Sequence, residues 1–249
     1  MRCYFNLQEV GTDEVAYTWL SGETLSDISN LSWDATDVWV SDMYYRIYYN
    51  IALCNEFLRH TTDDAIAAFD GQTQSTLRTY RAEARFLRAL FYYHALDFFH
   101  DIPFVSENDP VGSYIPPRYT AQQIFDFIET ELNEITGTEN GLLNRDECPY
   151  GRASKGAAYT LLARMYLNAE TYIGELAILN VSLLVTMPSN KAIRWNRIMP
   201  SCLMLITINV PTKLFLHFLL MLPLLFHGEL PRMWYVRRYL PAWHKTQSE

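Results

Sequence analysis

The chain has 249 residues, of which 49% are hydrophobic and 19% are charged, values that fit a globular protein with a buried core and exclude a disordered chain or a highly charged coiled coil. Its formal net charge of −8 argues against a general nucleic-acid-binding protein, which needs a basic face to displace counterions. The charge is uneven, because residues 1–174 carry 12 basic and 25 acidic side chains whereas residues 175–249 carry 8 and 3. We therefore divide the chain at this break.

The first residues and the cysteines carry no sign of export or of metal chemistry. The chain opens with Met-Arg-Cys-Tyr-Phe and shows no charged segment followed by an apolar run, so we expect no signal peptide in it. The four cysteines, Cys3, Cys54, Cys148 and Cys202, lie far apart without a CxxC pair, which argues against a metal or redox site. Cys54 falls in an apolar helical stretch and is predicted to lie in the core.

The spacing of apolar side chains predicts two long helices in the first hundred residues. Residues 1–32 have mixed composition, for which we predict loops and short turns. Residues 35–60 are predicted to be helical because apolar side chains recur three and four positions apart, and a short helix is predicted over Ala65–Ala68. The strongest pattern covers residues 73–100, where Phe86, His94 and their neighbours form an apolar stripe. The side chains predicted to line much of its remaining surface are Arg78, Arg81, Glu83, Arg85 and Arg88.

Two further helices are predicted after a proline-rich irregular stretch. Thr120 can cap a helix over 121–136, and a polar loop is predicted over 137–150. Residues 152–172 form the last predicted helix, whose small residues around Gly156 would let a neighbouring helix approach closely. Four helices in antiparallel pairs predict an all-α scaffold of helical hairpins.

Two segments carry more than a generic helical pattern. They are RAEARFLRALFYYHALDFFHDIPFV at 81–105 and GRASKGAAYTLLARMYL at 151–167, with RYTAQQIFDFIE at 118–129 between them and NLQEVGTDE at 6–14 ahead of them. In this order the segments resemble the SusD/RagB family of nutrient-binding lipoproteins of Bacteroidetes. The resemblance covers residues 1–174.

The resemblance implies a fold and a function. The family's scaffold consists of tetratricopeptide-like helical hairpins, anchored by lipid at the outer face of the outer membrane. Its members capture glycans or other nutrients without chemical change and pass them to a SusC-like TonB-dependent transporter. Against this pattern, the chain shows neither a signal peptide nor a lipidation cysteine, because no apolar stretch precedes Cys3.

The segment after Gly174 does not continue the family pattern. Its hydrophobic run, Leu214–Phe226, spans 13 residues, fewer than the ~20 that cross a bilayer. A shifted reading frame can be derived from the protein sequence. If each new codon takes the third base of one codon and the first two bases of the next, the codons of Trp195-Asn196 encode Glu and those of Met199-Pro200 encode Ala. The codons between them permit Pro, Asp and Tyr, and residues 200–222 permit a continuation that contains Glu-Ile-Ile-Phe. The resulting sequence, a loop followed by Glu-Ile-Ile-Phe, resembles the family's next segment. We therefore interpret residues 175–249 as an out-of-frame tail without a native fold.

No motif for catalysis or cofactor binding stands out. HExxH, GxSxG, GxGxxG and Walker patterns are all missing from the sequence, so we predict a protein that is not an enzyme and needs neither cofactor nor metal. The acid pairs Asp63-Asp64 and Glu129/Glu131 could suggest a glycosidase, but we interpret them as acids on helix surfaces. His94 is interpreted as a core histidine with its polar atoms satisfied.

For ligand contact, the candidates are tryptophans outside the strong helical stripes. Trp19 and Trp33 carry rings suited to stacking on sugars, although packing of the N-terminal segment onto the scaffold explains them as well. Trp39 and Tyr44–Tyr49 fall within a predicted helix and are expected in the core. Two alternative functions stay open at this point, a cytoplasmic helical-repeat module that binds another protein and a helical glycosidase.

Overall fold

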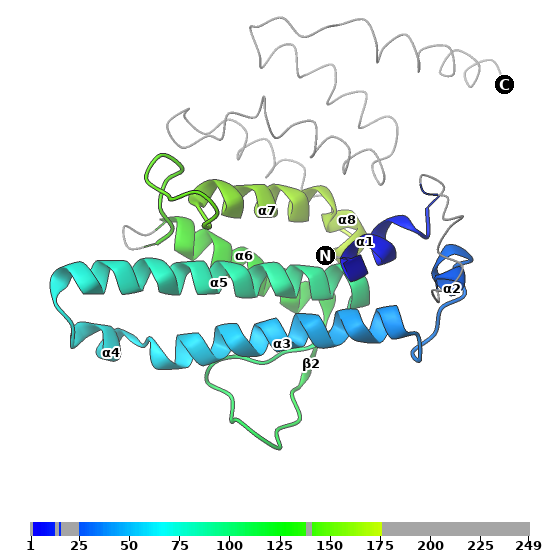
Figure 1. Ribbon diagram of the computed structural model, residues 1–249, viewed down its shortest axis with the longest axis horizontal. Coiled ribbons are helices and arrows are strands. Elements are labelled where there is room, and N and C mark those ends of the chain that lie inside the picture. The colour runs from blue at the N-terminus through cyan, green and yellow to red at the C-terminus, as the bar shows by residue number, and fades with distance from the viewer. Residues whose placement is uncertain (1, 13–14, 16–24, 138–140, 176–249) are drawn as a thin grey trace, which may run out of the picture. The chain divides into compact units, whose positions relative to one another are not determined.

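The computed structural model describes residues 2–12, 15, 25–137 and 141–175, and helices make up most of them (Figure 1). The helices are α1 (Arg2–Glu9), α2 (Ser26–Ser29), α3 (Val38–His60), α4 (Asp63–Ala67), α5 (Gly71–Phe99), α6 (Ala121–Gly137), α7 (Lys155–Leu167) and α8 (Ala169–Ile173), and the strands are β1 (Ile102–Pro103) and β2 (Arg118–Tyr119). The predicted scaffold of helical hairpins is confirmed. Residues 176–249, which make up nearly all of the predicted out-of-frame tail, lie outside the described residues.

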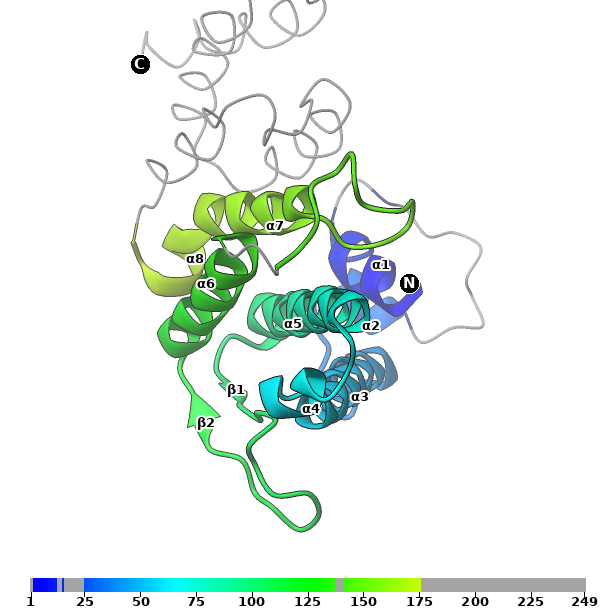
Figure 2. The ribbon, with the colours of Figure 1, turned by 90° about the vertical axis from the view of Figure 1, so that its left-hand side faces the viewer.

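The first hairpin pairs α3 with α5 (Figures 1 and 2). Asp37 caps α3, because its carboxylate accepts hydrogen bonds from the backbone N–H groups of Trp39 and Val40. Asp70 caps α5 in the same way through the N–H of Thr73. The predicted apolar spacing is confirmed in α3, where the buried side chains include Met43, Ile47, Ile51, Cys54 and Leu58.

The second hairpin pairs α6 with α7, and α6 also packs against α5. The predicted cap of α6 is confirmed, since Thr120 Oγ1 accepts from the N–H of Gln123 while the Gln123 side chain accepts from the N–H of Thr120. The single helix predicted over 152–172 is wrong. The helix is interrupted at Asn168, between α7 and α8. This interruption allows Tyr172 of α8 to be buried and to donate a hydrogen bond to Asp97 of α5 at 2.6 Å.

A helix at the N-terminus replaces the loop predicted there. Within α1, Cys3 and Asn6 are buried, and Val10 is buried just after the helix ends. The spacing of Cys3, Leu7 and Val10 by four and three positions was a helical signal that the sequence interpretation missed. The helix is attached to α5 by a hydrogen bond of 3.0 Å from Gln8 to Asp97.

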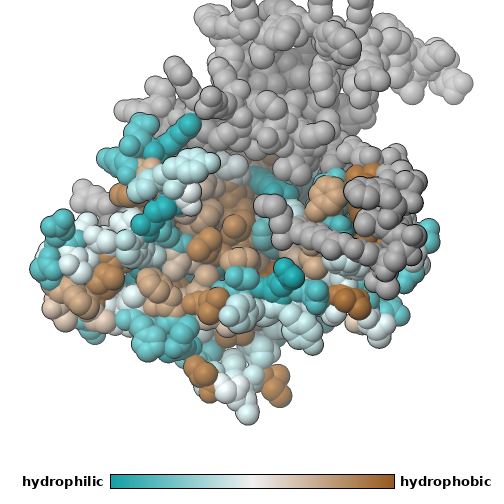
Figure 3. Space-filling model, in the orientation of Figure 1, coloured by the Kyte–Doolittle hydropathy of each residue, from teal (hydrophilic) through white to brown (hydrophobic). Residues whose placement is uncertain are grey.

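The proline-rich stretch forms a loop that stands away from the helices. Its ends are joined by β1 and β2, which pair antiparallel with Ile102 opposite Tyr119 and Pro103 opposite Arg118. Both ribbon views show the connecting residues projecting below α3 and β2 (Figures 1 and 2). The space-filling view shows hydrophobic side chains at the free end of this projection (Figure 3).

A buried arginine connects the two hairpins. Arg88 of α5 is 3% exposed, so its predicted place on the helix surface is wrong. Its guanidinium forms ion pairs with Glu107 at 2.5 Å and with Glu131 of α6 at 3.0 Å, and donates to the side-chain oxygen of Asn55 of α3 at 2.9 Å. Arg85 also pairs with Glu131, at 2.7 Å.

The electrostatics of this group keep Arg88 and Glu107 charged. Burial alone would lower the pKa of Arg88, but the neighbouring carboxylates of Glu131 and Glu107 outweigh it and hold that pKa above its ordinary value. Burial would raise the pKa of Glu107, but Arg88 holds it below its ordinary value. Glu131 is 8% exposed, so its interpretation as a surface acid is wrong.

Replacing Arg88 by methionine should destabilise the protein by about 3 kcal/mol, because a buried carboxylate loses a partner. The variant Arg88→Lys should be intermediate, since an ammonium cannot reach all three partners as the planar guanidinium does. Urea denaturation of the full chain at pH 7, followed by circular dichroism, measures the change. As a matched control, Arg46→Met on the exposed side of α3 should change the free energy of unfolding by less than about 0.5 kcal/mol. If Arg88→Met and Arg46→Met changed the free energy of unfolding equally, the stabilising role assigned to the buried ion pairs of Arg88 would be wrong.

His94 lies where α1 and α7 meet α5, and its surroundings favour the neutral ring. Its ring lies 4.9 Å from that of Tyr4, and its buried Nδ1 has no hydrogen-bond partner among the described residues. His94 is thus half-buried at the edge of the predicted core, and the predicted satisfaction of its polar atoms is wrong. Burial and the positive charge of Arg164 lower the pKa of His94 to about 4, against the opposing effect of Asp97.

This histidine should make the protein less stable in mild acid. The unfolded chain takes up a proton at His94 near pH 6.5, whereas the folded protein does so only near pH 4. The free energy of unfolding should therefore fall by up to about 3 kcal/mol between these two values. Thermal melts of the full chain from pH 7.5 to pH 4.5 measure the slope.

The variant His94→Phe should show a flatter pH profile, because the aromatic shape stays and the titrating group is removed. The control His60→Gln, at an exposed position, should keep the slope of the wild type. A His94→Phe profile parallel to the wild type would show that other groups cause the acid sensitivity.

Candidate functional site

The described residues contain one of the two candidate tryptophans, on the loop between α2 and α3. The loop turns sharply after α2, because the N–H of Ser32 donates to the carbonyl of Asp27 at 2.8 Å and Leu31 adopts a positive φ of 54°. It is stabilised further on by Asp34, whose carboxylate accepts from both the N–H and the hydroxyl of Thr36 at 2.7 and 2.6 Å. These local bonds fix the approach to α3 with little help from the core.

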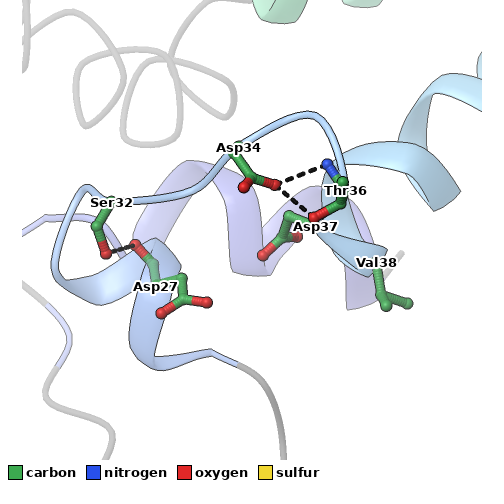
Figure 4. A pocket seen from close by; sticks show the side chains of 6 residues that line it. All are labelled: Asp27, Ser32, Asp34, Thr36, Asp37 and Val38. Atoms are coloured by element: carbon green, nitrogen blue, oxygen red, sulfur yellow. Dashed lines mark hydrogen bonds between the residues drawn. The ribbon is translucent and has the colours of Figure 1, made fainter.

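A polar pocket of about 200 Å³ opens at this loop (Figure 4). Its lining consists of Asp27, Ser32, Asp34, Thr36, Asp37 and Val38. Hydrogen bonds from Thr36 hold the pKa of Asp34 below its ordinary value, so this carboxylate is charged near neutral pH. Carboxylates and hydroxyls set around a half-open pocket are hydrogen-bonding groups that match the hydroxyls of a sugar.

Trp33 stands beside this pocket in the sequence, between two residues that line it, but does not line it itself. The residue is 48% exposed, so a substantial part of its surface is open to solvent and to a ligand. Trp19 lies outside the described residues. The structure therefore places Trp33 on the loop that carries the pocket, outside the pocket's lining, and the contact of either ring with a ligand stays a prediction.

Exposed tyrosines of α3 were missed by the sequence interpretation, which expected Tyr44–Tyr49 in the core. Tyr45 and Tyr49 are 70% and 66% exposed. Tyr44 and Tyr48 are half-buried, and their rings contact each other with centroids 4.5 Å apart and planes tilted by 40°. The signal was present, because positions 45 and 49 fall on the helix face opposite the buried Ile47 and Ile51.

Three of the four acids considered for catalysis have structural partners. Glu129 accepts a hydrogen bond from the hydroxyl of Tyr166 at 2.5 Å, and Glu131 belongs to the ion pairs of Arg85 and Arg88. Asp63 pairs with Arg81 at 3.0 Å. Within the described part of the chain, no group of three or more His, Cys, Asp or Glu side chains could hold a metal ion.

Among the helices that the structure describes, none combines the length and the apolar character needed to cross a membrane.

Comparison with known proteins decides the family. A profile of SusD-like proteins, described as "Starch-binding associating with outer membrane", matches residues 7–167. This chain belongs to the SusD-like family. The match covers both helical hairpins and the last three residues of α1, and it confirms the resemblance drawn from the segments at 81–105 and 151–167.

Individual SusD-like proteins resemble the chain over the same region. The starch-binding protein SusD of Bacteroides thetaiotaomicron is 33% identical over 174 residues, which span 70% of this chain and 29% of that protein. A SusD superfamily protein from Bacteroides vulgatus superposes with a TM-score of 0.53 at 17% identity, over 66% of this chain and 33% of its own. A crystal structure with xylogluco-oligosaccharide gives a TM-score of 0.50 at 20% identity, over 67% and 32%.

The comparisons agree on the kind of protein. The chain spans about a third or less of the length of these relatives, and it carries part of a mostly helical SusD-like fold. The family consists of non-catalytic glycan-binding proteins that associate with the outer membrane. That agrees with the prediction that the chain is not an enzyme.

Proposed function

We propose that this protein binds an oligosaccharide at the outer membrane without cleaving it and passes it to a SusC-like TonB-dependent transporter. The observation that carries the proposal is the 33% identity over 174 residues to a starch-binding protein. The location of the family at the outer membrane supports the site of action. The helical hairpins supply a rigid frame, and the loops that leave it supply contacts with ligand and transporter.

The alternative of a cytoplasmic helical-repeat module would use the same hairpins. It does not account for the match of residues 7–167 to a family described as starch-binding. The proposed function is tested with the purified full chain by affinity electrophoresis in gels that contain starch, xyloglucan or laminarin. Retardation by at least one polysaccharide supports it, provided that no reducing ends are released. Unretarded migration in every gel would contradict it.

For the ligand contact we propose Trp33 and Trp19, whose rings can stack on the apolar face of a sugar. Replacing Trp33 by alanine should weaken glycan binding by about two- to tenfold, because an aromatic contact contributes about 0.5–1.5 kcal/mol. The variant Trp33→Phe should keep most of the affinity, since it keeps a ring. Affinity electrophoresis in a retarding gel measures these changes.

A matched control is Tyr150→Ala, which removes a fully exposed aromatic ring from another loop and should leave binding unchanged. Loss of binding in Trp19→Ala but not in Trp33→Ala would assign the contact to Trp19 alone. Wild-type affinity in both variants would remove both residues from the site.

We also propose that residues 175–249 are translated out of frame, on the basis of the charge break and the shifted-frame residues near Trp195. Sequencing the coding DNA and its flanks tests this. A SusD-like reading frame that continues past the codon for Gly174 is the expected result. An intact frame through Glu249 in independent isolates would show that the tail is genuine.

A further inference from the structure

Helix α1 is attached to the frame of the two helical hairpins by polar side chains around His94. Tyr4 of α1 accepts a hydrogen bond from the guanidinium of Arg164 of α7 at 3.2 Å, and its ring contacts that of His94 edge-on with centroids 4.9 Å apart. One turn further along α1, Gln8 donates to Asp97 of α5 at 3.0 Å. These contacts join α1 to α5 and α7 through the surroundings of one imidazole ring.

The His94 ring has no acceptor ready for an added proton. Its buried Nδ1 makes no hydrogen bond within the described part of the chain. The carboxylate of Asp97, on the same helix, already accepts from Gln8 and from Tyr172 of α8. In the charged form of histidine both ring nitrogens carry a hydrogen, so protonation would leave a buried N–H without a partner.

The charges around the ring also oppose a proton there. The titratable groups that surround it are Tyr4 from α1, Tyr93 and Asp97 from α5 and Arg164 from α7, while Tyr172 of α8 reaches it through Tyr93 and Asp97. Arg164 is the cation of this group, and its guanidinium lies 5.3 Å from the centre of the Tyr93 ring. Burial and this positive charge lower the pKa of His94 to about 4, against the opposing effect of Asp97.

Helix α1 can leave the frame without disrupting the rest of it. The helix has eight residues, too few to be stable without packing against other segments. The two hairpins are joined by Arg88, whose partners lie on α3, on α6 and in the loop between β1 and β2. Release of α1 would therefore expose His94 to water while the hairpins stay packed, as in the local openings of other proteins.

We propose that His94, with Tyr4 and Arg164, forms an acid-sensitive switch, which keeps α1 packed on the frame while the ring is neutral and releases it when the ring is protonated. Acid thus acts on α1 before it unfolds the hairpins. The switch goes beyond the proposed function and does not depend on which glycan the protein binds.

Proton linkage gives the size of the effect. On release, His94 regains its ordinary pKa of 6.5, whereas in the packed state that pKa is about 4. The equilibrium constant for the opening of α1 should therefore rise by about 30-fold between pH 7.5 and pH 5.

Cys3 provides a probe for the release, because it lies on α1 and is 4% exposed. The purified full chain is treated at pH 7.5 and at pH 5 with dithiodipyridine, a disulfide reagent that reacts with thiols in mild acid, and the labelled cysteines are quantified by mass spectrometry. Each rate is divided by that of a short cysteine peptide at the same pH, which removes the intrinsic reactivity of the thiol. The normalised rate at Cys3 should rise by about 30-fold at pH 5. Cys54, buried in α3, should then react at least ten times more slowly than Cys3.

Three variants separate the switch from a general effect of acid. In His94→Phe the Cys3 rate should change by less than about threefold between the two pH values, because the aromatic shape stays and no proton is taken up. In Arg164→Met the Cys3 rate should be higher at pH 7.5 and rise less toward pH 5, since Tyr4 loses its donor and His94 loses the neighbouring cation. The control His60→Gln, at an exposed position, should behave as the wild type does.

Three results would overturn the proposal. A wild-type Cys3 rate that stays constant with pH would show that α1 remains packed. The same rise in His94→Phe as in the wild type would assign the release to other groups. Equal rates at Cys3 and Cys54 at pH 5 would show that the whole fold opens rather than α1 alone. Each of these results leaves glycan binding to be judged by affinity electrophoresis.

Discussion

The described structure depends most on the ion pairs and the hydrogen bond that the guanidinium of Arg88 forms. A buried cation needs partners for its charge and its N–H groups, and here the partners of Nη1 and Nη2 come from three other segments, whereas the buried Nε has no hydrogen-bond partner among the described residues. Asn55 is supplied by α3, Glu131 by α6 and Glu107 by the projecting loop. The first hairpin, the second hairpin and the loop must therefore adopt their relative positions together.

Aromatic packing extends this constraint from the core to the loop. Phe104, at the start of the loop, stacks on Tyr92 and on Tyr119 with centroids 5.2 and 4.5 Å apart, and Phe127 of α6 contacts it edge-on at 4.8 Å. Tyrosines also act as core residues with a polar end, as when Tyr48 donates to the carbonyl of Pro103 at 2.8 Å. The many tyrosines of the chain thus contribute to core packing as well as to the exposed surface.

This architecture separates the packed helices from the loops that carry the candidate contact residues. Family membership rests on residues 7–167, which contain the helical frame. The candidate ring of Trp33 lies on a loop that leaves this frame, and the loop is anchored by the capping residue Asp37 at its base. A SusD-like protein of this design can vary what it contacts through its loops without disturbing the packed helices.

The sequence by itself determined the family, the helical class and the bounds of α3, α5 and α6 to within a few residues. Those features depend on local signals, namely apolar spacing in α3 and capping groups such as Thr120. Only the tertiary structure decided where each polar side chain lies, because burial depends on neighbours distant in sequence. The sequence predicts Arg88 on the helix surface, whereas the structure buries it against Asn55 and Glu131.

The dependence of burial on distant neighbours also explains the other differences between the predicted and the observed structure. The helix at the N-terminus is short, and such a helix gains most of its stability from packing, here against α3 and α5. Tyr45 lies exposed within an aromatic run that resembles a core segment, because the face it occupies meets no other described helix. The periodicity of apolar side chains therefore determined where the helices form. Contacts between segments distant in sequence determined which helix faces are buried and against which partners.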